Sequence, residues 1–276
     1  MVEPQTELGR RELIAGLRAA GLADRRCIVH ASLRGFGQVA GGAATVAEAL
    51  CAVARTVVVP TFTHAPAAIP PPEDRPARNG CDYERDRLGD AHPTPFTPDQ
   101  PVARDIGAIA EALRGMPGAR RSDHPLSSFA AVGADAARYV TDYAWDAPMT
   151  PIARLAEDGG DVVHLATDYT SCTTVHYGEQ LAGRKPFIRW ALVASGGVQR
   201  VRVGGCSQGF NALAPWIKGI VETHIGRARV RRVPMAAIIT ATRAVLADDP
   251  RALVCDPACA RCRDAVLGGP EENDEC

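Results

Sequence analysis

A hydroxyl, an imidazole and a carboxylate recur at regular intervals in the segment 173–179. Thr173, His176 and Glu179 stand three residues apart, so a helix that begins here would carry all three on one broad face. A short apolar run at 161–166 precedes them and predicts a buried strand, with a polar turn leading into the helix. These groups therefore predict a proton-handling site at the carboxyl end of a strand, where open α/β sheets bind ligands.

The surroundings of His176 decide whether it can serve as a base. A helix N-terminus favours the neutral imidazole that a general base needs, whereas Glu179 favours the protonated form. Ser171 or Thr173 is the expected N-cap of this helix. The alternative is a surface histidine, or a core histidine with satisfied hydrogen bonds, because three polar residues at this spacing are common in helices.

The elements that must position these residues alternate between strand and helix. The run at 56–61 is apolar throughout, as expected for a strand covered on both faces. A glycine-containing turn between 187–194 and 198–203 predicts an antiparallel hairpin. We therefore expect an α/β fold, with helices on both sides of a central mixed sheet in a three-layer α/β/α arrangement. The other expected elements are strands at 27–30, 129–132 and 161–166, and helices at 6–20, 45–54, 104–114, 134–140, 151–156, 210–224 and 235–247.

We expect a single domain over residues 1–267, interrupted by a long proline-rich insertion near 64–103. Loops of this length are usually functional or disordered. The carboxylates of the insertion are candidates for attracting a polycationic substrate, and the alternative is a solvated loop whose arginines neutralise them. The tail 268–276 is polar and acidic and is expected to be disordered. The insertion interleaves Glu73, Asp74, Asp82, Glu84, Asp86 and Asp90 with Arg75, Arg78, Arg85 and Arg87.

Composition is that of an ordinary globular protein and excludes several classes of partner. Of the 276 residues, 46% are hydrophobic and 23% are charged, and the net charge is −1. Nothing in this balance calls for nucleic acid or an anionic membrane, so a small-molecule substrate is expected. No apolar run has transmembrane length, and the N-terminus lacks a signal-peptide pattern. Nine scattered cysteines do not form a secreted disulfide framework, which favours a cytoplasmic protein. The sequence leaves open whether the protein is a monomer or a homodimer.

Several further segments occur in the order typical of one family. A strand ending in Val-His-Ala-Ser-Leu is followed by a second strand, Thr-Val-Val-Val-Pro-Thr-Phe-Thr, and by a central block that contains Ser-Asp-His-Pro. Together with the Thr-x-x-His-x-x-Glu element, they make the chain resemble the aminoglycoside 3-N-acetyltransferases over roughly residues 10–265. These antibiotic N-acetyltransferases are unrelated to the GNAT acetyltransferases. The segments are 29–33, 56–63, 106–114, 118–125, 128–133 and 148–155.

The resemblance implies an acyltransferase of antibiotic resistance that uses acetyl-CoA as cosubstrate. The acceptor would be the 3-amino group of an aminoglycoside, acetylated by direct transfer. His176 would be the general base, Glu179 would orient it, and Thr173 or nearby backbone amides would support the tetrahedral oxyanion.

Acetyl-CoA is expected at the carboxyl end of the first strand, where backbone amides and serine hydroxyls can receive pantetheine or pyrophosphate. Arginines in the same blocks are candidates for phosphate charges. His30 could instead be a structural histidine that anchors its loop. The expected binding residues are His30, Ala31, Ser32, Leu33, Arg34, Arg121, Ser122 and Ser127.

Two positions depart from the family pattern, and they leave the acceptor open. Thr97 and Thr170 stand where family members usually carry aspartate. A second hypothesis is therefore an acetyltransferase of the same fold that acts on another amine, such as a natural-product intermediate. A third is a thiol acyl-enzyme with Cys172 as nucleophile beside His176. A non-catalytic binding module is the least supported.

A second site is predicted near the C-terminus. Three cysteines follow the pattern C-x3-C-x2-C in the segment 255–262, and a fourth thiol lies upstream in a glycine-rich stretch. Four thiolates can close a tetrahedral structural zinc site that joins the tail to the body. The alternative is a set of reduced, solvent-facing thiols. The proposed ligands are Cys206, Cys255, Cys259 and Cys262.

Overall fold

The computed structural model describes residues 7–271 and is built on a seven-stranded mixed sheet. Its middle strand, β1 (Arg26–Ala31), pairs in parallel with β2 (Thr56–Pro60) and with β6 (Asp161–Leu165). The four outer strands run antiparallel to their neighbours, so the expected mixed sheet is confirmed. The strand order is β4-β5-β2-β1-β6-β10-β9, with β4 at Arg120–Arg121, β5 at Phe129–Gly133, β10 at Ala228–Pro234 and β9 at Val221–Ile225.

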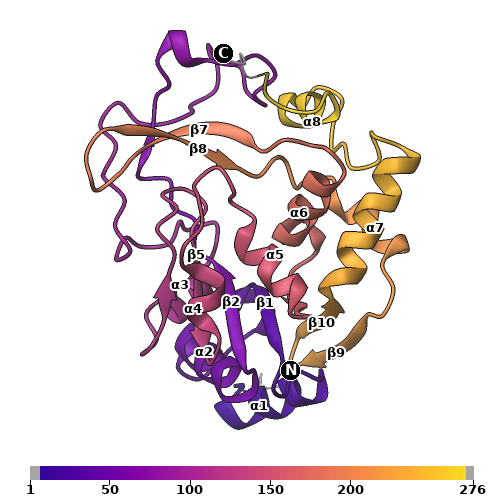
Figure 1. Cartoon of the computed structure of the whole chain (residues 1–276). Helices are drawn as coiled ribbons and strands as arrows, with labels where there is room; N and C mark the ends of the chain where they lie inside the picture. Colours follow the sequence, from indigo (N-terminus) through magenta and orange to yellow (C-terminus); the bar gives the residue numbers. More distant parts are fainter. Residues whose placement is uncertain (1–6, 272–276) are drawn as a thin grey trace, which may run out of the picture.

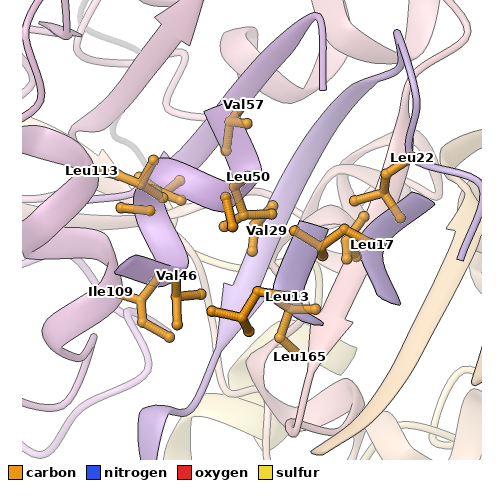
Figure 2. Packing of buried hydrophobic residues seen from close by; sticks show 14 of the residues in the cluster. Leu13, Leu17, Leu22, Val29, Val46, Leu50, Val57, Ile109, Leu113 and Leu165 are labelled. Carbon is orange, nitrogen blue, oxygen red and sulfur yellow. The ribbon is translucent and has the colours of Figure 1, made fainter. Parts of the chain in front are cut away.

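One face of this sheet is covered by the helices α1 (Arg10–Ala19), α2 (Gly42–Val53) and α3 (Ala108–Arg114). Each helix turns apolar side chains three or four residues apart toward the strands, as amphipathic helices do. Figure 2 shows these side chains gathered over the sheet. The labelled residues from the helices are Leu13, Leu17, Val46, Leu50, Ile109 and Leu113, and those from the strands are Val29, Val57 and Leu165.

The opposite face carries the helices that build the site. Because side chains alternate along a strand, Val29 lies in the first core and Ile28 in the second. The same alternation explains why β2 reads as apolar throughout, since both of its faces are buried. The covering helices are α4 (Ala136–Val140), α5 (Thr150–Glu157), α6 (Thr173–Leu181) and α7 (Met235–Asp248).

The expected hairpin is present as β7 (Phe187–Leu192) and β8 (Val198–Val203), but it belongs to a second sheet. Its third strand, β3 (Ala67–Ala68), comes from the proline-rich insertion. Asn79 extends this contact, since its side chain accepts from Ile188 N at 2.8 Å and donates to Ile188 O at 3.0 Å. Figure 1 shows the hairpin beside α8 (Ala260–Val266), at the end of the molecule opposite α1.

One expected helix is wrong. In place of a helix over 210–224, the chain forms the 3₁₀ helix η4 (Phe210–Trp216) and then the strand β9. Pro215 cannot donate a helical hydrogen bond, and Gly219 adopts a φ of 74°, so the helical pattern breaks between them. The strand β10, with its arginine-rich sequence, is a further element that the sequence pattern does not predict.

The tail is only partly described. Two hydrogen bonds join residues 268–271 to the body: Lys185 N donates to Gly268 O at 3.1 Å, and Glu271 N donates to Ala77 O at 3.1 Å. The rest of the tail, 272–276, lies outside the described residues. Within 7–271 no helix has the length and apolarity needed to cross a membrane.

Candidate active site

A cleft of about 1400 Å³ opens at the carboxyl ends of the parallel strands. Its walls include Ala31 at the end of β1, Phe62 after β2 and Thr167 after β6. The second sheet closes the cleft from above through Val203 and Arg189. This is the position where open α/β sheets bind ligands, because strand ends and helix N-termini converge there.

His176 lies on this cleft, and its ring is held from three sides. Nδ1 is 2.7 Å from Oε2 of Glu179, one helical turn further along α6. The ring of Phe210 meets the imidazole edge-on, with ring centroids 4.9 Å apart. Gly204 lies against the opposite edge, where an added Cβ would be 2.7 Å from Cδ2. With Nδ1 bonded to Glu179, Nε2 is the nitrogen left to exchange protons with a bound molecule.

The turn before α6 aims the helix at the cleft. The side chain of Asp168 accepts from Thr170 N at 3.0 Å and from Asn211 Nδ2 at 3.0 Å, which fixes the short helix η3 (Tyr169–Ser171). The N-cap of α6 is Cys172, without a side-chain cap bond, and not Ser171 or Thr173 as expected. Thr173 is the first helical residue and lines the cleft.

His30 also lines the cleft, at the end of β1, and is 5% exposed. Its ring stacks on His164 of β6 with centroids 5.4 Å apart, because the two residues are register partners. Burial lowers the pKa of His30 to about 3, so its ring is neutral across the physiological range. Its Nε2 is buried without a hydrogen-bond partner among the described residues, so the ring packs by stacking and not by a hydrogen bond through Nε2.

The predicted acetyl-CoA residues divide into two groups. His30, Ala31, Ser32, Leu33, Arg34 and Ser127 all line the cleft. Arg121 does not, since its guanidinium donates to Thr61 O, Gln100 O and Ser128 Oγ. Ser122 is also turned inward, where Oγ accepts from Phe129 N at 3.0 Å. Both side chains hold the loops together instead of facing a ligand.

The cleft contains more cations than carboxylates. Among the described residues only two carboxylates line it, and each has a partner: Asp90 pairs with Arg87 at 3.0 Å and Asp105 with His64 at 3.4 Å. The other acidic residues of the insertion do not line the described cleft, which favours the solvated-loop alternative over a negative rim. The arginines that line the cleft are Arg34, Arg87, Arg104, Arg189 and Arg261.

The surroundings of Cys172 do not favour its proposed role as a nucleophile. Cys172 is fully buried, and burial raises the pKa of its thiol to about 12. A nucleophilic cysteine requires the opposite shift, toward the thiolate.

Four cysteines meet where the C-terminal segment crosses the end of β8. The sulfurs of Cys206, Cys255, Cys259 and Cys262 all lie within 4.8 Å of one another. Cys255 Sγ is 3.6 Å from Cys206 Sγ and 3.5 Å from Cys262 Sγ. Two sulfurs of a tetrahedral zinc site are about 3.8 Å apart, from a Zn–S distance of about 2.3 Å. The donor set and spacing therefore fit zinc.

Three residues of the site were not found from the sequence. Gly204 and Phe210 contact the ring of His176 from segments remote in sequence, and Arg184 bonds to Glu179. For Arg184 a local signal existed, because Gly183 just before it is a typical helix C-cap residue. No pattern within the chain pointed to the other two.

Comparison with known sequences agrees with this geometry. The family described as aminoglycoside 3-N-acetyltransferase matches residues 28–247, so the chain belongs to that family. Aminoglycoside N(3)-acetyltransferase VII of Streptomyces paromomycinus is 34% identical over 63% of this chain. Aminoglycoside N(3)-acetyltransferase VIII of Streptomyces fradiae is 32% identical over 70% of this chain and 68% of its own length. The chain spans only about 60% of the length of the former relative.

Comparison with solved structures agrees on the fold. The apoenzyme of aminoglycoside acetyltransferase AAC(3)-IVa superposes with a TM-score of 0.77, over 96% of this chain and 99% of that chain, at 24% identity. A structure described as AAC-IIIb in binary complex with CoASH gives a TM-score of 0.72 over 88% of this chain and 97% of that chain, at 26% identity. The three-layer α/β fold expected from the sequence is thus confirmed.

Proposed function

We propose that the protein is an acetyl-CoA-dependent N-acetyltransferase that acetylates the 3-amino group of an aminoglycoside. The observation that carries this is the hydrogen bond between His176 Nδ1 and Glu179, at 2.7 Å, with the same ring lining a cleft of about 1400 Å³. The names of the relatives from Streptomyces and the complex of AAC-IIIb with CoASH support the reaction and the cosubstrate.

In the proposed mechanism the acetyl group moves directly from sulfur to nitrogen. His176 Nε2 accepts the proton that the acceptor nitrogen loses as it attacks the thioester carbonyl. The C–N bond forms, the C–S bond breaks, and the departing CoA thiolate takes the proton back. Glu179 holds the ring in the tautomer that leaves Nε2 unprotonated, and Thr173 lies at the helix end where the tetrahedral oxyanion would be stabilised.

Acetyl-CoA would bind along the end of β1. The hydroxyls of Ser32 and Ser127 offer hydrogen bonds, and Arg34 offers a charge for a phosphate. The backbone N–H of Ser32 is already used, since it donates to Leu165 O at 2.9 Å. His30 would close the floor of this site as a neutral ring.

A second candidate acceptor is an amine other than an aminoglycoside. The excess of arginine over carboxylate in the cleft favours it, because a polycationic acceptor gains most from unpaired negative charge. Thr170 lines the cleft at a position where an aspartate would have supplied that charge.

Release of free thiol from acetyl-CoA tests both candidates. We would supply gentamicin, sisomicin and apramycin beside monoamines and amines that carry a carboxylate or phosphate, and locate the acetyl group by NMR. Turnover with aminoglycosides at the 3-amine supports the first proposal. Turnover confined to the other amines supports the second, and a lack of thiol release with every one of these acceptors contradicts both.

We also propose that Cys206, Cys255, Cys259 and Cys262 hold a structural zinc ion. Their sulfur spacing supports this, and four thiolates form the closed coordination that is typical of structural sites. Bound zinc would neutralise the thiolates and fix segment 255–262 to the end of β8. We place the protein in the cytoplasm, because the scattered cysteines of the sequence do not form a secreted disulfide framework.

A further inference from the structure

We propose that Arg184 is a positioning residue that weakens the proton affinity of His176 by sharing the carboxylate of Glu179. The proposal deepens the proposed function and rests on His176 as the base. It concerns a side chain that does not line the large cleft.

The carboxylate of Glu179 lies between two cationic or potentially cationic groups. Its Oε2 faces His176 Nδ1 at 2.7 Å, and its Oε1 accepts from Arg184 Nη1 at 2.5 Å. The side chains are 12%, 9% and 12% exposed for His176, Glu179 and Arg184, so water screens these interactions weakly. Each oxygen of the carboxylate therefore has one dedicated partner.

The C-terminal cap of α6 places Arg184 at this point. Gly183 adopts a left-handed φ of 93°, and its N–H donates to Gln180 O at 3.0 Å. Arg184 N then donates to Glu179 O at 3.0 Å, which completes a Schellman motif. The chain thus reverses direction next to Glu179, so the residues that end α6 also bring Arg184 close to the Glu179 carboxylate.

The guanidinium is fixed at its other end as well. Arg184 Nη2 donates to Pro250 O, in the turn after α7, at 2.5 Å. A planar fork with donors in two directions can bond a carboxylate and a carbonyl at once, which the single ammonium of lysine does less well. Arg184 therefore lies between Glu179 and the chain after α7.

The consequence for His176 follows from the charges. Glu179 and Arg184 together are close to neutral, so protonating His176 creates a net positive charge in a poorly hydrated site. Without Arg184, protonation would complete a neutral ion pair with Glu179 and would be more favourable. Arg184 thus lets Glu179 orient the imidazole without locking it in the protonated form, which could not act as a base.

Other groups face His176 and must be held constant in a test. Gly204 and Phe210 are uncharged contacts from the end of β8 and from η4. Lys185 shares the small pocket behind the ring, while His30, Arg189 and Arg261 lie in the walls of the large cleft. Cys206 follows Gly204 by two residues. Thr242 of α7 packs against Gly178 of α6.

The experiment compares the wild type with Arg184→Met, Arg184→Gln and Arg184→Lys. NMR titration of ¹³C-labelled histidine follows His176 without substrate, and thiol release against pH follows kcat/KM with acetyl-CoA and sisomicin. We expect both neutral variants to shift the His176 titration and the acidic limb of the rate profile to higher pH. Arg184→Lys should shift them less. Arg243→Met, an exposed arginine on α7, is the control and should shift neither.

An unchanged His176 titration in a folded neutral variant would overturn the proposal. Failure of both neutral variants to fold, with Arg184→Lys intact, would also count against it, because Arg184 would then be a structural residue. The titration needs no turnover, so it judges Arg184 even if wild-type protein acetylates no sisomicin. A wild-type protein that does not acetylate sisomicin would contradict only the assignment of an aminoglycoside as acceptor.

Discussion

Gly204 lies against the imidazole of His176 so closely that a methyl group at 204 would be 2.7 Å from Cδ2 and 3.0 Å from Nε2. The backbone at the end of β8 thereby forms one wall of the pocket that holds the proposed base. The neighbouring Gly205 has more room, since a methyl group there would be 3.4 Å from Phe187. The pair offers a matched test of how closely the ring must be positioned.

Gly204→Ala should displace the His176 ring and lower kcat by roughly tenfold to a hundredfold, because small misplacements of a reacting group slow catalysis strongly. Thermal stability should fall only modestly, since the ring has cleft space on one side. Gly205→Ala is the control and should keep most of the activity. Steady-state kinetics with acetyl-CoA would decide, and wild-type kcat in Gly204→Ala would show that ring position is not limiting.

His176→Ala should leave acetyl-CoA binding near the wild-type affinity and lower kcat by about a hundredfold to ten-thousandfold, as expected for the loss of a general base. Glu179→Gln should do less damage, because the amide keeps a hydrogen-bonding group beside Nδ1. Calorimetric binding and thiol-release kinetics would separate the two effects. A well-folded His176→Ala protein with normal turnover would mean that the residue only packs against Phe210.

Elemental analysis should find about one zinc ion per chain, in keeping with four thiolate ligands. Cys259→Ser, or a strong chelator, should lower the melting temperature before it abolishes acetyl-CoA binding, because none of the four cysteines lines the cleft. Cys51→Ser is a suitable control, since that thiol lies on α2, away from the cluster. A protein that contains no metal and whose melting temperature is unchanged by the chelator or by Cys259→Ser would contradict the zinc proposal.

Acid should destabilise the protein before its carboxylates titrate, and His124 should be one cause. Its Nδ1 accepts from Ser127 N at 2.9 Å, and Nε2 donates to Arg202 O at 2.9 Å, so the buried ring must be neutral. Burial lowers the pKa of His124 to about 4, below the value of about 6.5 in unfolded chains. The unfolded state therefore binds the proton first as pH falls.

The resulting stabilisation is complete above pH 6.5 and is lost between about 6.5 and 4. At pH 5, His124 alone should reduce the free energy of unfolding by about 2 kcal/mol relative to pH 7.5. Urea unfolding at the two pH values would measure this, and His124→Asn should flatten the dependence. An equally steep dependence in the variant would assign the acid sensitivity to other groups, His30 first among them.

Much of the sheet could be anticipated from local patterns. Apolar runs such as 56–61 are long and uninterrupted because both faces of β2 are buried, and the turn at 195–197 separates β7 from β8 unambiguously. A helix was wrongly predicted over 210–224 because the apolar residues there fit a helical period. Pro215 and Gly219 interrupt that helix in the structure. Strand β10 was not predicted because Arg229, Arg231 and Arg232 interrupt the alternation of apolar and polar residues that is typical of a strand.

By itself, the sequence determined that Thr173, His176 and Glu179 share one helical face, since spacing along a single helix needs no tertiary information. It also indicated that Cys206 joins the three C-terminal thiols, and the structure brings them together. Only the tertiary structure decided that Arg121 faces inward, that the insertion keeps most of its carboxylates out of the cleft, and that Gly204 borders His176. These outcomes depend on how distant segments pack against one another, and no periodicity within one segment encodes that contact.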